Sequence, residues 1–395
     1  MAFEMIENDA QSAFNQGTNI KVIGVGGGGG NAVEHMIASG VRGVEFICAN
    51  TDAQALKSSS AHQFLQLGKT GLGAGGKPVV GRESADQARG QIRDALEGAH
   101  MLFITAGMGG GTGTGAAPVI AKIAREMGIL TVAVVTRPFD FEGSKRMTNA
   151  EQGLAELEAN VDSLIVVLNE KLLEVYGEDI SQKEAFAKAN DVLKNATGGI
   201  AEIINVPGLI NADFEDVKSV MGEPGKAMMG TAVASGPDRA RLAAEQAVVC
   251  PLLDGVDLSG AKGVLVNITA DDSLRLGETR EAMNAIRAYA SPDANIIFGT
   301  VNDPSMGDSL RVTVLATGLS GKAEKAAPEL TVIRTGTDNR PVMTAAYGMQ
   351  GGADPLQSPA IWRSGRGAPS AHVNALMQSG MDEVEIPAFL RKQAD

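Results

Sequence analysis

The stretch AGMGGGTGTGAAP, residues 106–118, lies between an apolar run and a helical pattern. Its glycines leave a long piece of main chain bare, and Thr112 and Thr114 supply its hydroxyl groups. A strand that passes through a glycine loop into a helix directs backbone N–H groups outward at the positive end of the helix dipole. We therefore predict a phosphate site, in which both threonines can donate to phosphate oxygens or help to hold a metal.

A second glycine run, GVGGGGGN at residues 24–31, has the same setting. The runs before the two loops, and those after the helices that follow, are continuously apolar, as in parallel strands covered on both faces. This alternation predicts an α/β fold with a doubly wound, mainly parallel sheet, in which both loops emerge at the carboxyl edge. Two anion-binding loops at one edge suit a polyphosphate, and a third glycine-rich stretch, residues 70–78, is placed to cover its terminal phosphate. The strands are expected at residues 20–25, 44–50, 101–107, 129–136 and 163–168.

The pattern changes after residue 180. Residues 181–204 form one long helical pattern, weakened by Gly198 and Gly199 and ended by Pro207 and Gly208. A smaller α+β unit follows, and the Gly-, Pro- and Ser-rich residues 320–380 are typical of a disordered linker. The last residues regain apolar side chains, as docking peptides do. The smaller unit is expected to have strands at 226–235, 262–269, 295–302 and 310–318, and helices at 238–249 and 274–288.

Composition excludes several classes of protein. A net charge of -13 argues against a nucleic-acid partner, and an aromatic content of 4% argues against stacking platforms for bases. Cys48 and Cys250 lie in apolar runs and are expected to be buried free thiols in a reducing cytosol. We expect no signal peptide, and no apolar stretch approaches the ~20 residues that a membrane span needs.

The familiar nucleotide motifs fit only in part. Gly24, Gly26 and Gly29 satisfy G-x-G-x-x-G, and Asp52 follows the next strand where a ribose-binding acid of a dinucleotide fold would lie. An NAD-dependent oxidoreductase is therefore one alternative, but it leaves the second glycine loop unexplained. The GKT at 68–70 is not a Walker motif, because Gln63 stands where that motif needs glycine, and HQFLQL is a poor match to an apolar strand.

The sequences GGGTGTG at 109–115 and IKVIGVGGGGGNAV at 20–33 resemble the loops of the tubulin/FtsZ family. The resemblance runs from about residue 20 to 318 and resumes at IPAFLRKQAD. It implies a cytoplasmic GTPase that assembles head to tail into filaments at the midcell division ring of bacteria, beneath the inner membrane. It implies a flexible N-terminus (1–19), a GTP-binding domain (20–180), a central helix (181–207), a C-terminal GTPase-activating domain (208–319), the disordered linker (320–380) and a partner-binding peptide (381–395).

The resemblance also implies which residues bind GTP or GDP. The two glycine loops would hold the phosphates, FEGSKRM at 141–147 would supply a ribose-contacting acid and an arginine, and the central helix would bind guanine. Asn190 stands where some relatives carry Asp, and it offers one acceptor to the guanine edge where Asp offers two. Mg²⁺ is expected with GTP, and no metal site of the chain's own is predicted. The binding residues are Gly27, Gly28, Gly29, Gly30, Asn31, Gly111, Thr112, Gly113, Glu142, Arg146, Phe186 and Asn190.

From the residues alone, two of these assignments have simpler alternatives. Glu142 and Arg146 are spaced as a modest helix pair, and Phe186 is equally suited to a core.

Neither glycine loop supplies a catalytic carboxylate. In NADFEDVK, residues 211–218, Asp213 and Asp216 share one helix face, and their spacing fits helix capping equally well. The resemblance implies instead that Asn211, Asp213 and Asp216 are catalytic and complete the GTPase site of the next subunit. A relative that only binds nucleotide or only polymerises is the remaining alternative, and the two aspartates argue against it.

The resemblance further implies partners for the last residues. Membrane-adaptor and regulatory division proteins would bind them, without nucleic acid and without direct membrane insertion. The residues concerned are Glu385, Ile386, Pro387, Phe389, Leu390, Arg391 and Lys392.

Overall fold

A computed structural model describes residues 18–177, 179–205, 210, 212–223, 226–249 and 260–319. The chain separates into two units, Met1–Glu329 and Leu330–Asp395, and the second lies wholly outside the described residues. The predicted linker, the C-terminal peptide, Asn211 and Cys250 therefore lie outside them too.

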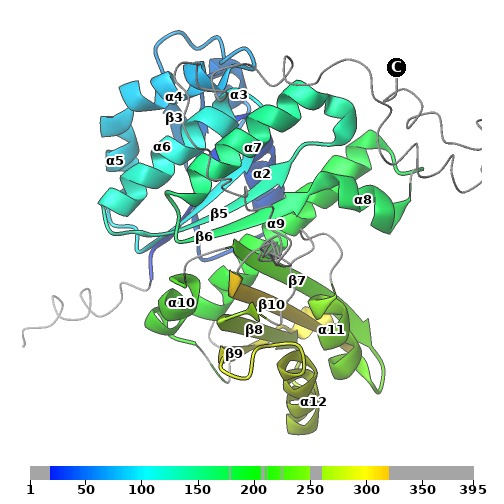
Figure 1. Ribbon diagram of the computed structural model, residues 1–395. Helices are drawn as coiled ribbons and strands as arrows, with labels where there is room; N and C mark the ends of the chain where they lie inside the picture. Colours follow the sequence, from blue (N-terminus) through cyan, green and yellow to red (C-terminus); the bar gives the residue numbers. More distant parts are fainter. Residues whose placement is uncertain are drawn as a thin grey trace, which may run out of the picture. The chain divides into compact units, whose positions relative to one another are not determined.

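Ten strands of the described part form one sheet in the order β3-β2-β1-β4-β5-β6-β7-β10-β8-β9 (Figure 1). The first six are parallel, and their order is that of a doubly wound sheet, which reverses direction between β1 and β4. β1 pairs with β4 from Ile20↔Met101 to Val25↔Ala106, so both glycine loops leave the sheet side by side. The six are β1 (Ile20–Val25), β2 (Glu45–Asn50), β3 (Gln63–Gln66), β4 (Met101–Gly107), β5 (Leu130–Arg137) and β6 (Ser163–Leu168).

Helices cover both faces of this parallel part. Successive strand residues point to opposite faces, so Val22 and Phe103 are buried under α2 (Gly26–Ala38) and α9 (Gln182–Asn205). Ile23 and Ile104 are buried on the other face, in a second core. Both faces need apolar side chains, which explains the continuous apolar runs and confirms the predicted fold class. The second core is covered by α4 (Pro78–Gln87), α5 (Arg89–Leu96), α6 (Thr112–Glu126) and α7 (Ser144–Glu158).

The strands expected after residue 225 are all present, and the last of them lies inside the sheet rather than at its edge. β10 pairs antiparallel with both β7 and β8, and β8 pairs parallel with β9. Gly199 of α9 faces β10, where a Cβ would lie 3.2 Å from Thr313 Cγ2, so the glycine pair permits close packing. The elements are β7 (Lys226–Ser235), β8 (Gly263–Ala270), β9 (Asn295–Asn302), β10 (Ser309–Leu319), α10 (Phe214–Met221), α11 (Arg239–Val248) and α12 (Leu276–Arg287).

The sequence HQFLQL does contain a strand, contrary to expectation. β3 is a four-residue strand at the edge of the described sheet, and its one partner among the described strands is β2. Leu65 is buried, whereas Phe64 is 48% exposed. An edge strand with one partner needs few apolar residues, so the test for a buried apolar run missed it. The remaining short elements are α3 (Ala53–Lys57), α8 (Asn169–Tyr176), η1 (Asp140–Glu142) and η3 (Pro304–Met306).

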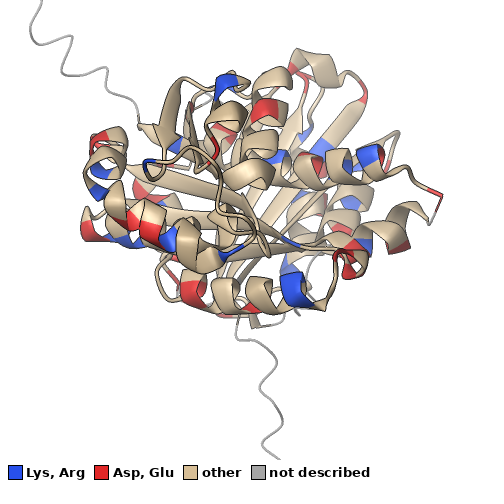
Figure 2. Cartoon of the chain, turned by 90° about the horizontal axis from the view of Figure 1, so that it is seen from above, with Lys and Arg blue, Asp and Glu red and all other residues tan. Residues whose placement is uncertain are grey.

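Acidic and basic residues are interspersed along the outer helices of the described part (Figure 2). Several form ion pairs between neighbouring helices, such as Arg89 with Glu126 and Arg82 with Glu156. None of the described helices is both long enough and apolar enough to cross a membrane.

Candidate functional site

A cavity of about 420 Å³ lies where the strand order reverses between β1 and β4. Ligands of doubly wound sheets bind at this position, outside the carboxyl ends of the strands. Ten of the twelve residues predicted to bind nucleotide line the cavity, and Gly29 and Gly30 do not. The ten are Gly27, Gly28, Asn31, Gly111, Thr112, Gly113, Glu142, Arg146, Phe186 and Asn190.

The two glycine loops contact each other through main-chain atoms. A Cβ on Gly28 would lie 3.0 Å from Gly107 Cα, and one on Gly26 would lie 2.9 Å from Gly113 N. Gly29 packs α2 onto β4, since its Cβ would be 2.3 Å from the Thr105 carbonyl oxygen. The glycines thus bring two helix N-termini to one side of the cavity, where backbone N–H groups favour an anion.

The third glycine-rich stretch lies over the second loop. A Cβ on Gly111 would lie 2.8 Å from Ala74 Cβ and 2.9 Å from Lys77 N. One on Gly115 would lie 2.0 Å from the Pro78 carbonyl oxygen, so the start of α4 rests directly on α6. Gly76 itself lines the cavity. This arrangement is consistent with the predicted cover.

The two threonines of the second loop have different surroundings. Thr112 lines the cavity, and its Oγ1 lies 2.6 Å from Thr51 Oγ1 at the end of β2. Thr114 is buried and accepts a hydrogen bond of 2.8 Å from the Gly109 N–H. Thr114 does not line the cavity, and its hydroxyl oxygen binds the loop's own backbone, so the structure offers no support for a Thr114 contact to phosphate or metal.

Glu142 and Arg146 lie on the wall formed by η1 and the start of α7. Glu142 Oε1 accepts a hydrogen bond of 3.0 Å from the Phe139 N–H, and Oε2 accepts one from Arg146. The pair predicted from spacing does form, but Glu142 precedes α7 and its side chain is only 14% exposed. The two side chains therefore form part of the cavity wall, with the Glu142 carboxylate largely buried and the Arg146 side chain 53% exposed.

Phe186 and Asn190 lie one turn apart on α9, at the cavity. The Phe186 ring is 39% exposed and meets Phe139 edge to face, with centroids 5.4 Å apart, so it is not a plain core residue. The neighbouring Asp191 does not line the cavity and bonds His35 of α2 instead.

Sequence reasoning missed Asn169, which also lines the cavity. It is 3% exposed, and no residue of the described ranges hydrogen-bonds its Oδ1. A buried amide oxygen without a partner is costly, so a ligand donor is its natural complement. The available signal was a polar residue immediately after the apolar strand β6, at the carboxyl edge of the sheet.

The predicted catalytic aspartates lie elsewhere in the chain. Asp213 and Asp216 are exposed at the N-terminus of α10, which packs against β8 and β9, and neither lines the cavity. They form the capping arrangement that their spacing allowed. Among the described residues that line the cavity, Glu142 is the single carboxylate, and it is already paired.

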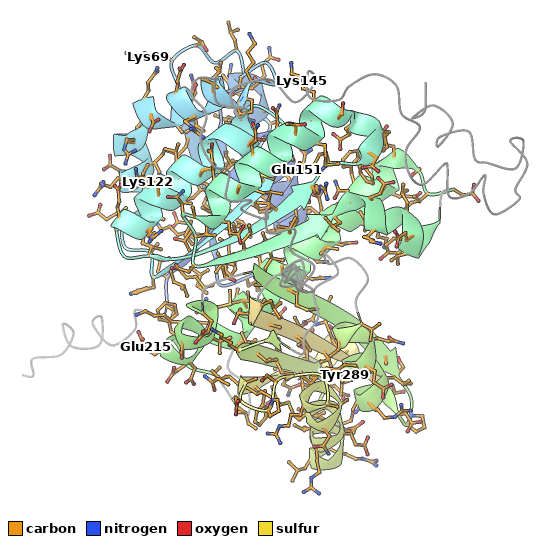
Figure 3. The ribbon with its side chains drawn as sticks, viewed as in Figure 1. Lys69, Lys122, Lys145, Glu151, Glu215 and Tyr289 are labelled. Atoms are coloured by element: carbon orange, nitrogen blue, oxygen red, sulfur yellow. The ribbon has the colours of Figure 1, made fainter. Side chains whose placement is uncertain are left out.

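The features that favoured other nucleotide folds do not reach the cavity. Asp52 caps α3 by accepting a hydrogen bond of 2.8 Å from the Gln54 N–H. Lys69 of the GKT sequence lies on an outer loop with its side chain extended away from the fold (Figure 3). Neither residue lines the cavity, which leaves the dinucleotide and Walker interpretations without their defining side chains.

Comparison with known proteins matches both parts of the sheet. The Tubulin/FtsZ family GTPase domain matches residues 19–177, and the FtsZ family C-terminal domain matches residues 225–320. The cell division protein FtsZ of Pseudomonas aeruginosa is 54% identical over 100% of both chains, and that of Coxiella burnetii is 58% identical over 81% of this chain and 83% of its own. A solved FtsZ dimer from M. jannaschii has a TM-score of 0.74 and 41% identity, and covers 80% of this chain and 93% of that chain. The chain therefore belongs to the tubulin/FtsZ family and contains its GTPase domain.

Proposed function

We propose that this chain is a GTP-dependent cytoskeletal GTPase of bacterial cell division, which assembles head to tail into filaments and hydrolyses GTP between subunits. One observation carries the proposal. The cavity has anion-binding loops and a wall suited to a base, but its single described carboxylate is already paired, whereas the start of α10 carries exposed carboxylates, among them Asp213 and Asp216. Each chain then provides the nucleotide-binding cavity of one hydrolytic site and the α10 carboxylates of another. A second copy of the chain supplies the carboxylates that the cavity lacks.

Each wall of the cavity has a proposed part in holding the nucleotide. Backbone N–H groups of Gly27, Gly28 and Gly111–Gly113 hold the phosphates, with Asn31 beside them. Gly29 acts by letting α2 begin against β4, and Gly30 remains a proposed main-chain contact of the same loop. Glu142 accepts from a ribose hydroxyl, and Arg146 neutralises nearby negative charge.

The guanine end is proposed to use α9 and Asn169. Phe186 packs against the face of the base, and Asn190 accepts from its N–H edge. Asn169 Oδ1, which has no partner among the described residues, accepts a second N–H of the base.

Hydrolysis is proposed to begin when α10 of the next subunit meets the phosphates. Asp213 and Asp216, together with Asn211, orient a water for in-line attack, and the glycine-loop N–H groups hold the oxygens on which charge accumulates. Mg²⁺ fits this site as a companion of GTP, since the Thr112 hydroxyl stands on the cavity wall and Mg²⁺ is commonly held by few protein oxygens plus phosphates. When bound, the ion would neutralise phosphate charge.

The cellular role follows from the family. Relatives named cell division protein FtsZ, and a solved FtsZ dimer, support self-association and a place in the division ring at midcell. We propose that the residues from Glu385 to Lys392 bind membrane-adaptor and regulatory proteins there.

The proposal is tested by following phosphate release at saturating GTP over a range of protein concentrations, with light scattering in parallel. Turnover per chain should be close to zero in dilute samples and should rise together with scattering. Turnover per chain that is independent of concentration would overturn hydrolysis between subunits. Titration with NAD serves as a control for ligand class and should show no binding.

A further inference from the structure

The helix that begins at the first glycine loop is bonded to the helix that lines the base end of the cavity. His35 Nε2 of α2 lies 2.8 Å from Asp191 Oδ1 of α9. The two side chains are 28% and 34% exposed. The other ion-pair partners of Asp191 in the described part are Lys194 at 3.3 Å and Lys188 at 3.8 Å, both on α9 itself. His35 is thus the one described partner that ties Asp191 to another element.

The position of this bond relates it to the ligand. His35 follows Asn31 by four residues on α2, so the two lie one turn apart on the same helix face. Asp191 directly follows Asn190 on α9. Asn31 and Asn190 both line the cavity. The bond therefore joins two cavity-lining helices, one turn from Asn31 and one residue from Asn190.

The chemistry of the pair suits a fixed contact. Burial acts to raise the pKa of Asp191, and the hydrogen bond from His35 together with the charge of Lys194 outweighs it, so that the pKa is lowered overall. Asp191 is thus an acceptor at neutral pH. The imidazole donates through Nε2–H whether it is neutral in that tautomer or protonated.

We propose that the His35–Asp191 hydrogen bond is a positioning contact that holds the phosphate-binding and base-binding helices at the separation that a guanine nucleotide requires. The inference rests on the proposed function, because it assumes that the cavity binds the nucleotide along this axis. Without the bond, α9 can move relative to α2. Part of the free energy of nucleotide binding is then used to fix the two helices, and the affinity falls.

The test measures GDP affinity of the full chain, because GDP binding can be followed without assembly. His35→Ala and Asp191→Ala should each weaken GDP binding about tenfold, the value expected of a charge-assisted hydrogen bond. The double variant should bind GDP as tightly as the single variant with the lower affinity, because the two single substitutions remove the same hydrogen bond. His35→Gln, whose amide Nε2 can replace the imidazole Nε2, should recover most of the affinity.

Lys194→Met is the matched control, since it removes a partner of Asp191 on the same helix and keeps the bond between helices. Its GDP affinity should stay within about twofold of the original. In assembled samples, His35→Ala should raise KM for GTP and leave kcat unchanged.

Two results would overturn the positioning role. In the first, His35→Ala lowers the Tm of the nucleotide-free chain but leaves GDP affinity unchanged, which would make the contact merely structural. In the second, the loss of GDP binding free energy in the double variant equals the sum of the losses in the two single variants. Failure of the proposed site is recognised separately, because Phe186→Ala and Asn190→Ala would then also leave GDP affinity unchanged.

Discussion

Asp213 and Asp216 are hydrogen-bonded to each other's backbone across the first turn of α10. Asp213 Oδ1 accepts from the Asp216 N–H at 2.7 Å, and Asp216 Oδ2 faces the Asp213 N–H at 3.4 Å. This reciprocal capping satisfies N–H groups that a helix start leaves without partners. It also holds both carboxylates in fixed, exposed positions before any other molecule approaches. Capping and catalysis are therefore compatible functions of one arrangement.

The catalytic role can be separated from the capping role by the choice of substitution. Asp213→Ser keeps an N-cap oxygen while removing the carboxylate, and Asp216→Ala leaves the cap acceptor in place. Both variants should bind GTP normally and lose at least about a hundredfold in turnover. Glu215→Ala is the control, because Glu215 is an exposed acid of the same turn (Figure 3) and should be dispensable. Weakened GTP binding with normal turnover per bound site would contradict completion of the site by a neighbour.

Gly115→Ala should separate α4 from α6. The added Cβ would lie 2.0 Å from the Pro78 carbonyl oxygen, which is main chain and cannot move alone. We expect a loss of about 1–3 kcal/mol in the free energy of unfolding, together with weaker GTP binding because the covering stretch shifts. Urea denaturation and nucleotide titration measure the two effects. Gly90→Ala, in an exposed helix position with open space around it, should instead stabilise the chain by up to about 1 kcal/mol.

Asn190→Asp should sharpen recognition of guanine. The carboxylate offers two acceptors to the N–H edge of the base, whereas inosine lacks the amino group that would use the second. The ratio of GTP to ITP affinity should rise about tenfold, even if the added charge weakens both nucleotides. Asn195→Asp adds the same charge elsewhere on α9 and should leave the ratio unchanged. An unchanged ratio in Asn190→Asp would show that this side chain does not contact the base edge.

The Arg239–Glu278 pair predicts a pH effect on stability. Arg239 Nε donates to Glu278 Oε1 at 2.7 Å, and the side chains are 8% and 15% exposed. This hydrogen bond lowers the pKa of Glu278 below its usual 4.5. Because the folded pKa is depressed, the stabilisation is complete above pH 4.5 and is lost as the pH falls through the folded pKa. Glu278→Gln should cost about 1–3 kcal/mol at pH 7, and its difference from the unsubstituted chain should shrink below pH 4.5. A difference that stays constant down to pH 3 would contradict this.

The C-terminal segment should be removable without loss of hydrolysis. Leu319 is 1% exposed and pairs with Lys226, so a shortened chain must end after residue 319 rather than at Gly318. This chain should retain GTP hydrolysis and lose binding to membrane-adaptor proteins in a pull-down assay. The full chain with Phe389→Asp should lose binding to the membrane-adaptor proteins to the same extent. Retained adaptor binding by the shortened chain would locate the contact elsewhere.

Local sequence was sufficient for the central strands and for the two glycine loops of the cavity wall, whereas Glu142, Phe186 and Asn190 were expected there only from the family resemblance. β1, β4 and β6 are buried on both faces, so their apolar runs identify them without reference to partners. The carboxyl ends of such parallel strands lie at one edge of the sheet, which brings Gly28 close to Gly107. The glycine loops can also be recognised from local sequence, because their contacts are made by main-chain atoms and require only that side chains be absent.

Features that depend on residues distant in the sequence were harder to predict from the sequence. β3 is a strand because β2 provides a partner, and its own sequence carries little signal. Thr114 looks equivalent to Thr112 in the sequence, and only the path of the loop directs its hydroxyl to Gly109. Asn169 is distinguished by what surrounds it, since an unpartnered buried oxygen cannot be recognised before the fold is known.

The close main-chain contacts at Gly29, Gly111 and Gly115 also bear on how this gene can vary. Every amino acid that a single nucleotide change can put in place of glycine carries a Cβ, and at these three positions that carbon would meet main-chain atoms at 2.3, 2.9 and 2.0 Å. No single amino-acid replacement at these positions therefore avoids the close contact. A library of point variants grown under selection for division should therefore be depleted at these codons, and should retain variants at Gly90, where nothing lies within 4 Å.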